Sequence, residues 1–530
     1  MELRVKILST ILALLLTVLL CCSSVSGAEA DKDKVFEFTF YVDDDGGTSV
    51  VVSFYDVAIG SSWLLIPRGQ EGNVSVAVHR GKLVNISYES LIEDGRESPF
   101  YVNMTFTYEG EDYVNLSIKY FMAYGSLIIE PKAMFVSPRV KCGGKDFIKT
   151  MTLLPGYAIT SRSDVSSFSG SIKDVEVSAF NGFVIVEASV RSDDRVVIRY
   201  EVPSKPSMVN ISLGNLVFRT PSRYSGFAQQ VLEVLNESYA ICREVFGIDL
   251  KDVEVVFFVP SMPDLAMGLM GYVPFMADKL GAVHLNLLYI RGVEGFLHIV
   301  ALHEIIHHFM WAIGVPPLKL WIHEGVAQYL SLTIGRLLGY EGAVDMHERG
   351  LVLAWRVLGD ELGFIQRWTP FYTPPQGLGH CYAASYKIFK ELCDRYGGLE
   401  YLKILLRELR RVDWSNETQV IEAFGLAAGN VNDVFVSFHR WGFEFKTPLQ
   451  ASIIIAKVKG DVSRMPEWLE PHKSLAQVLI RVAELLQKNE ASYRATILAE
   501  VARSIYELSP YTFVVSLAMV VLAIVVSRHA

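Results

Sequence analysis

Two histidines and a glutamate lie within one short segment and have the types and spacing of a metal site. Residues 303–307 read His-Glu-Ile-Ile-His. On a helix, His303 and His307 are one turn apart and share a face, so both imidazoles can reach one metal ion. Glu304 lies beside that face, where a carboxylate can take a proton from a water bound to the metal.

A second glutamate supplies the third ligand that such a site requires. Residues 321–327 read Trp-Ile-His-Glu-Gly-Val-Ala, and Glu324 follows His307 by 17 positions. We expect this segment to begin a second helix that packs against the first. A catalytic zinc ion takes three protein ligands and one water, and His303, His307 and Glu324 complete that set. A buried carboxylate without a cation is costly, and the metal supplies the cation.

These two segments together resemble the gluzincin zinc metallopeptidases of clan MA, nearest to the membrane-alanyl and glycyl aminopeptidases. The resemblance covers about residues 213–441 and rests on HExxH followed by Trp-x-x-Glu-Gly-x-Ala. It implies a thermolysin-like catalytic domain, often behind an N-terminal β domain. It also implies one zinc ion held by His303, His307 and Glu324, with Glu304 as general base and acid. The 16 residues between His307 and Glu324 make a shorter loop than these aminopeptidases show.

A tyrosine downstream of the metal ligands is the expected hydrogen-bond donor to the transition state. The family carries this tyrosine in a Tyr-x-x-Gly element, and residues 382–385 read Tyr-Ala-Ala-Ser, with serine in place of glycine. A phenol can donate to the oxyanion that forms when water attacks a carbonyl. Tyr382 is therefore the expected donor, and Tyr386 and His380 remain alternatives. His308 and His323 have no family role and are candidates for supporting the ligands.

One element of the aminopeptidase pattern is missing. These enzymes carry a Gly-x-Met-Glu-Asn strand whose glutamate holds the free amino terminus of the substrate. The comparable segment, residues 281–286, reads Gly-Ala-Val-His-Leu-Asn and has no glutamate. It can still serve as an edge strand that pairs with an extended peptide. The sequence therefore does not distinguish an aminopeptidase from an endopeptidase.

The elements that must position this site begin with a β-rich region. Residues 34–211 contain short runs of alternating apolar and polar residues, separated by Asp- and Gly-rich turns. Period-two strands at this spacing predict an antiparallel β-sandwich, in one or two units. We therefore expect a β-rich N-terminal domain over residues 31–212.

Helical spacing dominates the rest of the chain. It predicts a multidomain α+β protein, in which a mainly helical catalytic domain follows over residues 213–447. Its main helices are expected at residues 297–313, 320–338 and 381–396. Residues 448–508 include an amphipathic stretch and are expected to form a helical stalk.

The two ends of the chain predict export and membrane anchoring. Residues 1–28 combine two basic residues, an apolar run and a small polar stretch, which is typical of a secretory signal peptide. Residues 510–527 are apolar and precede Arg528, as in a short transmembrane helix with its positive end inside. An uncleaved signal anchor and a buried core helix are the respective alternatives. The Asn-x-Ser/Thr sites agree with a glycosylated extracellular part: Asn73, Asn85, Asn103, Asn115, Asn210, Asn236 and Asn416.

Composition excludes several functional classes. The 530 residues suffice for about three to four domains of ordinary size. Hydrophobic residues make up 51% and charged residues 20%, which excludes wholesale disorder. The formal net charge is −9 without any block of Lys or Arg, so no basic face is available to bind nucleic acid.

Four cysteines remain after removal of a signal peptide, at positions 142, 242, 381 and 393. None forms a CxxC pair, which argues against a thiolate zinc site. If Cys381 and Cys393 share a helix, they lie about 18 Å apart and cannot pair. Any disulfide would then use Cys142 or Cys242.

These observations predict a single-pass zinc metallopeptidase at the cell membrane, with its catalytic part outside the cell. It would hydrolyse a peptide or protein substrate, with Glu304 activating the water and Tyr382 stabilising the oxyanion. One alternative is a non-catalytic surface or adhesion protein with a structural metal site, and another is a tethered module whose β domain binds a partner. An intact Glu304 favours the enzyme, because a structural site does not need it. The sequence leaves the oligomeric state open.

Overall fold

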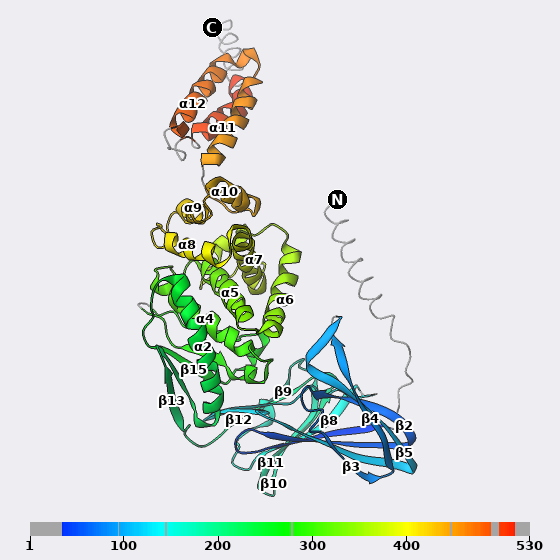
Figure 1. Cartoon of the computed structure of the whole chain (residues 1–530). Helices are drawn as coiled ribbons and strands as arrows, with labels where there is room; N and C mark the ends of the chain where they lie inside the picture. The colour runs from blue at the N-terminus through cyan, green and yellow to red at the C-terminus, as the bar shows by residue number, and fades with distance from the viewer. Residues whose placement is uncertain are drawn as a thin grey trace, which may run out of the picture.

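The computed structural model describes residues 34–93, 95–143, 146–276, 279–445, 448–488, 495 and 498–514. The predicted signal peptide at residues 1–28 lies outside them, as do residues 515–527 of the predicted anchor. The described chain has a β-rich N-terminal part, a mainly helical middle part and a separate group of helices at its C-terminal end (Figure 1). This confirms the predicted order of a sheet domain followed by a helical region. Among the described residues, no helix is both long and apolar enough to cross a membrane.

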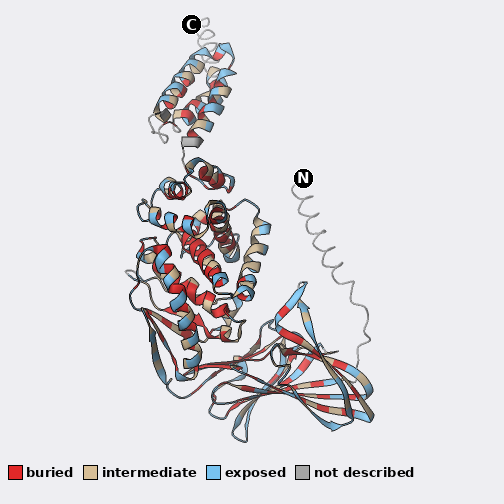
Figure 2. Ribbon diagram, viewed as in Figure 1, coloured by how far each residue is buried: buried red, intermediate tan, exposed pale blue. Residues whose placement is uncertain are grey.

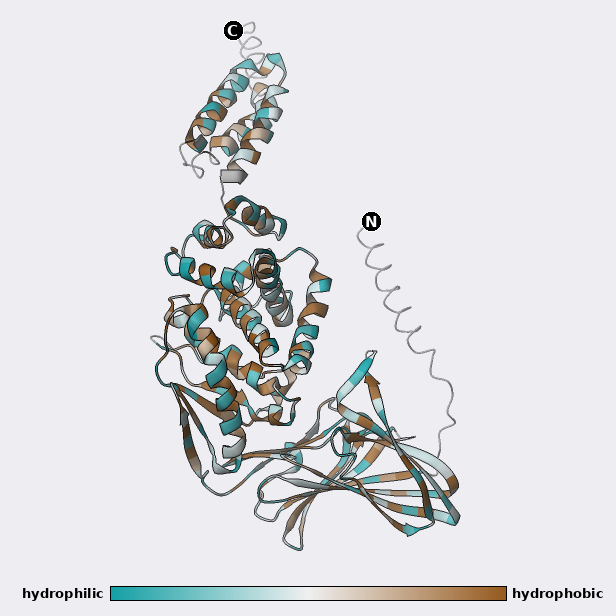
Figure 3. Cartoon of the chain, viewed as in Figure 1, coloured by the Kyte–Doolittle hydropathy of each residue, from teal (hydrophilic) through white to brown (hydrophobic). Residues whose placement is uncertain are grey.

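A sheet of eight strands within the described residues forms the outer part of the N-terminal domain. Apolar and polar side chains alternate along its strands, as the sequence predicted (Figure 3). β1 and β8 are parallel, so this sheet is mixed, whereas the sequence predicted an antiparallel β-sandwich. The alternation of side chains is the same in both strand directions, and it therefore could not reveal this. The strand order is β10 (Ile172–Phe180), β11 (Phe183–Arg191), β8 (Phe147–Pro155), β1 (Val35–Val42), β2 (Thr48–Pro67), β5 (Arg96–Met122) and β3 (Ser75–Arg80), with β4 (Lys82–Glu93) also on β5.

A second sheet lies between this large sheet and the helical region. It consists of β6 (Ser126–Ile129), β7 (Lys132–Val136), β12 (Val196–Glu201) and β9 (Val165–Ser167). Successive side chains of a strand point to opposite faces. Ala133 and Phe135 accordingly join the core of the N-terminal domain, while Met134 and Val136 join the core of the helical region. Because both faces are covered, β6 and β7 are almost continuously apolar.

A third sheet opens the helical region. Its strand order is β13 (Met208–Leu213), β14 (Leu216–Pro221), β15 (Val253–Phe258), β17 (Val283–Asn286) and β16 (Gly271–Tyr272). The domain boundary predicted between residues 212 and 213 falls inside β13, which pairs with β14. The helices of this region are α2 (Ser225–Phe246), α3 (Met262–Ala266), α4 (Phe296–Ala312), α5 (Leu320–Leu337), α6 (Glu341–Leu358), α7 (Leu378–Tyr396), α8 (Leu399–Leu409), α9 (Glu417–Ala427) and α10 (Val431–Arg440).

α4 and α5 lie at the centre of the helical region and are largely buried (Figure 2). A helix that is apolar on nearly every side has to be surrounded by other elements. α4 begins after Gly295, whose φ is 82° and where a Cβ would lie 2.3 Å from Cγ of Tyr340. It ends before Gly314, at φ 89°, and the two prolines at 316 and 317 cannot continue a helix. Both ends of α4 are therefore fixed by local sequence.

Of the four cysteines that the sequence considered for a disulfide, three are buried in the helical region and Cys142 is buried in the core of the N-terminal domain. Cys381 and Cys393 both lie on α7, and Cys242 lies on α2. All three are buried thiols. Burial raises the pKa of Cys381 to about 12, so this thiol stays protonated at neutral pH.

The C-terminal helices pack around a core of their own, in the region where the sequence predicts a stalk. They are α11 (Pro448–Ser463), α12 (Glu470–Lys488) and a further helix over residues 498–514. Ile455, Val458, Ile480 and Ala499 belong to this core. This core is distinct from that of the helical region that carries α4 and α5.

Candidate metal centre

The structure brings the three predicted metal ligands together from α4 and α5. Nε2 of His303 lies 3.1 Å from Oε2 of Glu324, and Nε2 of His307 lies 3.6 Å from the same oxygen. One ligand atom from each residue lies within 4.8 Å of the other two. Tetrahedral zinc with bonds of about 2.0–2.1 Å places its ligand atoms about 3.3 Å apart. The donor types and their separations therefore fit one zinc ion.

The turn between the two helices sets the position of Glu324. α5 starts shortly after the prolines, and Nε2 of His323 hydrogen-bonds to the carbonyl oxygen of Val315 in this turn, at 3.1 Å. Burial lowers the pKa of His323 to about 4, so the ring is neutral and donates to this carbonyl from Nε2. The ring also lies 5.7 Å from that of His307. His323 therefore ties the first turn of α5 to the end of α4, beside the ligands.

The two ligand histidines have opposite pKa shifts. Burial opposes the charged form of His303, but the hydrogen bond and charge of Glu324 outweigh it and raise the pKa of His303. Burial and the neighbouring histidines hold the pKa of His307 well below its usual value. A metal ligand must be a neutral imidazole, and His307 already is. His308, the other candidate for supporting the ligands, is partly buried, and its Nε2 has no hydrogen-bond partner among the described residues.

Glu304 is buried next to the ligands and has an unusual pKa. Its side chain lies against β16, where a Cβ on Gly271 would be 3.1 Å from Oε1 of Glu304. Burial first, and then the charge of Glu324, raise the pKa of Glu304 to about 8, while His303 opposes this rise. A carboxyl group with a pKa near neutrality can both accept and release a proton at physiological pH.

Tyr382, the predicted oxyanion donor, is a buried tyrosine whose pKa responds to the carboxylates of the site. Burial raises the pKa of Tyr382 well above its usual value, and the charges of Glu324 and Glu304 raise it further. Its ring packs edge-on against Trp368, with the centroids 5.2 Å apart. Tyr382 therefore stays protonated and can donate a hydrogen bond close to both carboxylates.

The two alternatives to Tyr382 are engaged elsewhere. The hydroxyl of Tyr386 donates to Oε1 of Glu348 at 2.5 Å, and Arg336 pairs with the same carboxylate. Nδ1 of His380 hydrogen-bonds to the carbonyl oxygen of Gln376 at 2.6 Å. We therefore keep Tyr382 as the expected donor.

The edge strand beside the site is not the one that the sequence predicted. The expected segment, residues 281–286, contains β17, which is flanked on both sides by β15 and β16. β16 forms the edge of the described sheet and contacts Glu304 through Gly271. Phe275, just beyond β16, lies 6.5 Å from the ring of His307 and 5.7 Å from that of His323. β16 has only two residues, too few for an alternating pattern, and so sequence reasoning missed it.

Comparisons with known proteins give a distant structural likeness. No protein-family model matches the chain, and no curated protein matches it. The native leukotriene A4 hydrolase from Saccharomyces cerevisiae aligns with 84% of this chain and 76% of its own, at 12% identity and a TM-score of 0.34. The yeast LTA4 hydrolase in complex with bestatin covers the same shares, at 11% identity and a TM-score of 0.31. At these TM-scores we draw no conclusion about fold or function from the likeness. The metal centre is assigned from the geometry of its own residues.

Proposed function

We propose that this chain is a zinc-dependent metallopeptidase of the gluzincin type with a thermolysin-like catalytic domain. The observation that carries the proposal is the placement of Glu304. This carboxyl group is buried beside a complete set of zinc ligands, where it can reach a water on the metal. A site that only stabilised the fold would gain nothing from such a group, because burying an ionisable side chain without a partner is costly.

The residues of the site divide the work of peptide hydrolysis. His303, His307 and Glu324 would hold the zinc ion, which when bound lowers the pKa of a water and polarises a carbonyl group. Glu304 accepts a proton from the attacking water and passes it to the nitrogen of the leaving amine. The hydroxyl of Tyr382 donates a hydrogen bond to the oxyanion that develops on the substrate.

The substrate would lie along β16 as an extended peptide or protein segment. An edge strand offers backbone N–H and C=O groups that can pair with such a segment. Residues 267–276 around β16 contain no carboxylate that could hold a free amino terminus. The lack of a carboxylate here does not by itself distinguish cleavage at a chain end from internal cleavage. Export and membrane anchoring stay part of the proposal, on the sequence of residues 1–28 and 510–527.

The deciding experiment compares the unaltered chain with Glu304→Gln for zinc content and for hydrolysis of a mixed peptide library. We expect about one zinc ion per chain in both proteins, because glutamine leaves the three ligands in place. Hydrolysis should fall by about 10²–10⁴-fold, the usual contribution of a general base. Glu294→Gln, an exposed position just before α4, is the matched control and should keep full activity.

Three outcomes are informative. Loss of hydrolysis with retention of zinc supports the peptidase, and the cleavage sites show whether it acts at chain ends or internally. Zinc binding without hydrolysis by the unaltered chain supports the alternative, a surface protein with a structural metal site. Full activity of the Glu304→Gln variant would rule out the role of Glu304.

A further inference from the structure

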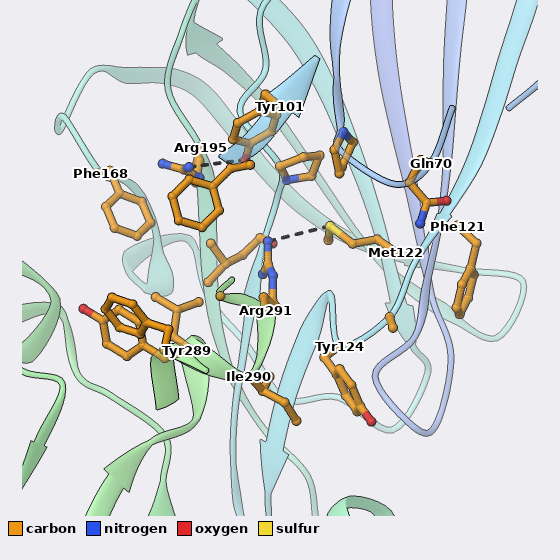
Figure 4. Close-up of a pocket in the computed structure, with 18 of the residues that line it drawn as sticks. Gln70, Tyr101, Phe121, Met122, Tyr124, Phe168, Arg195, Tyr289, Ile290 and Arg291 are labelled. Carbon is orange, nitrogen blue, oxygen red and sulfur yellow. Dashed lines mark hydrogen bonds between the residues drawn. The ribbon is translucent and has the colours of Figure 1, made fainter. Parts of the chain in front are cut away.

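A cavity of about 480 Å³ lies between the N-terminal domain and the helical region (Figure 4). The end of β5 and Arg195, just before β12, line one side, and η3 (Leu287–Arg291), which follows β17, lines the other. Aromatic side chains dominate the wall, among them Tyr124, Phe168 and Tyr289. The volume falls within the range of about 300–1,000 Å³ that is typical of ligand pockets. None of the residues of the metal centre lines this cavity.

Arg291 lies in the wall of this cavity without an acidic partner. One of its terminal nitrogens donates to the carbonyl oxygen of Val136 at 2.9 Å, and the other lies 3.7 Å from Sδ of Met122. Burial first, and to a smaller extent the charge of Arg195, lower the pKa of Arg291 to about 10, while Tyr101 opposes this shift. A guanidinium group in an apolar setting without a counter-charge is costly to maintain.

Arg195 faces the same cavity from β12's side and also lacks an acidic partner. Its guanidinium donates to the hydroxyl of Tyr101 at 3.2 Å (Figure 4). It lies 5.8 Å from the ring centroid of Tyr101 and 5.5 Å from that of Phe168. Within the described part of the chain, neither Arg195 nor Arg291 forms an ion pair with a carboxylate.

The nearby carboxylates are already engaged. Asp193 pairs with Lys141 at 3.0 Å and also with Arg139, and Glu93 pairs with Arg139 as well. Asp194 accepts hydrogen bonds from Ser169 and from the backbone N–H of Arg195, and forms no ion pair with the guanidinium group of Arg195 among the described residues. The cavity is therefore lined by two guanidinium groups that have no carboxylate partner among the described residues.

We propose that this cavity binds a small amphipathic carboxylate, with the acid group between Arg195 and Arg291 and the apolar body against the aromatic wall. A guanidinium group binds a carboxylate through two parallel hydrogen bonds, which satisfies its planar donors. A single anion would also offset the repulsion between the two arginines. A phosphate is a poorer match, because its additional charge and oxygens would face apolar side chains. The site lies apart from the metal centre and does not depend on the proposed function.

The test is calorimetric titration of the full chain with decanoate and with decanol, two probes that share an apolar chain and differ in charge. We expect decanoate to bind at least about tenfold more tightly than decanol, as for a charge-assisted hydrogen bond. Arg195→Gln and Arg291→Gln should each weaken decanoate binding about tenfold and leave decanol binding unchanged. Arg199→Gln, on β12 four residues after Arg195 and paired with Asp164, is the matched control and should not affect either probe.

Two further measurements keep the result unambiguous. Arg291→Gln also removes the hydrogen bond to the carbonyl oxygen of Val136. If Arg291→Gln does not fold, the result of Arg195→Gln decides the test, with Arg195→Lys as the charge-preserving comparison. A carboxylate can also bind a metal, and the titration is therefore repeated after chelation and in the Glu304→Gln variant, where decanoate binding should persist. Equal affinity for decanoate and decanol, an unaffected Arg195→Gln variant, or the absence of decanoate binding would each overturn the proposal.

Discussion

Gly325, the residue after Glu324, lies so close to α7 that a Cβ at this position would be 2.3 Å from Cδ2 of Phe389. The carbonyl oxygen of Ser385 would be 3.1 Å from the same Cβ. Glycine therefore allows α5, which carries Glu324, to pack directly against α7, which carries Tyr382. The third metal ligand and the expected oxyanion donor are positioned by one contact.

Gly325→Ala should disturb this contact and with it the site. The added methyl group has to displace a buried ring and a backbone carbonyl, and overpacking of this kind costs about 1–3 kcal/mol. We expect the free energy of unfolding in urea to fall by this amount and peptide hydrolysis to fall with it. Gly350→Ala on α6, where a Cβ would meet nothing within 4 Å, is the control and should stabilise the helix slightly. Equal stability of the two variants would contradict this account.

Glu324→Gln should weaken zinc binding while preserving the fold. Glutamine has the same shape, but it lacks the negative charge that a zinc site of two neutral histidines requires. We expect the zinc affinity, measured by competition with a chromophoric chelator, to fall well over tenfold. The matched variant Glu341→Gln, at the exposed start of α6, should bind zinc as the unaltered chain does. Unchanged zinc affinity in Glu324→Gln would remove this residue from the ligand set.

Tyr382→Phe and Tyr386→Phe should have different effects, although the two residues are one turn apart on α7. Loss of an oxyanion donor lowers kcat by about 10²–10³-fold, and we expect this for Tyr382→Phe with zinc content and KM nearly unchanged. Tyr386→Phe loses the hydrogen bond to Glu348, which should cost about 1 kcal/mol of stability and leave kcat intact. A large fall in kcat for Tyr386→Phe alone would reverse the assignment.

We expect the free energy of unfolding to fall between about pH 6.5 and pH 4 because of the titration of His347. Its ring is stacked on Phe296 at 4.1 Å, and burial, with a smaller effect of His303, lowers its pKa to about 4. Between these pH values the unfolded chain binds a proton that the folded chain excludes, which costs up to about 3 kcal/mol at the acid end. His347→Phe keeps the stacking and removes the titration. Urea unfolding at several pH values should therefore show a shallower loss of stability in the variant, and an unchanged slope would refute this role.

The local part of the site was predictable from the sequence, because helix periodicity alone places His303, Glu304 and His307. Glu324 could be added because one turn joins its helix to the first, and such a short connection brings the two helices together. The helical interval that carries Tyr382 was also recognisable. The structure brings His303, His307 and Glu324 together, and the chemistry assigned to the site stays a prediction for the experiments above.

The remaining features depend on contacts that leave little trace in the sequence. The parallel pairing of β1 with β8 leaves no mark in an alternating pattern. β16 is too short to show a period, and so its contact with Glu304 through Gly271 was not foreseen. Arg195 and Arg291 belong to different domains, and only the packing of these two domains against each other places both residues in one cavity.

The middle sheet of β6, β7, β12 and β9 has a consequence for the independence of the two domains. Phe135 and Met134 are adjacent in the chain, yet they belong to different cores. A chain divided at residue 212 would expose Met134 and Val136 on the N-terminal fragment. The C-terminal fragment would lose these residues from its hydrophobic core. We therefore expect a fragment that ends at residue 212 to be less stable than the same region within the full chain, because each domain completes part of the core of the other.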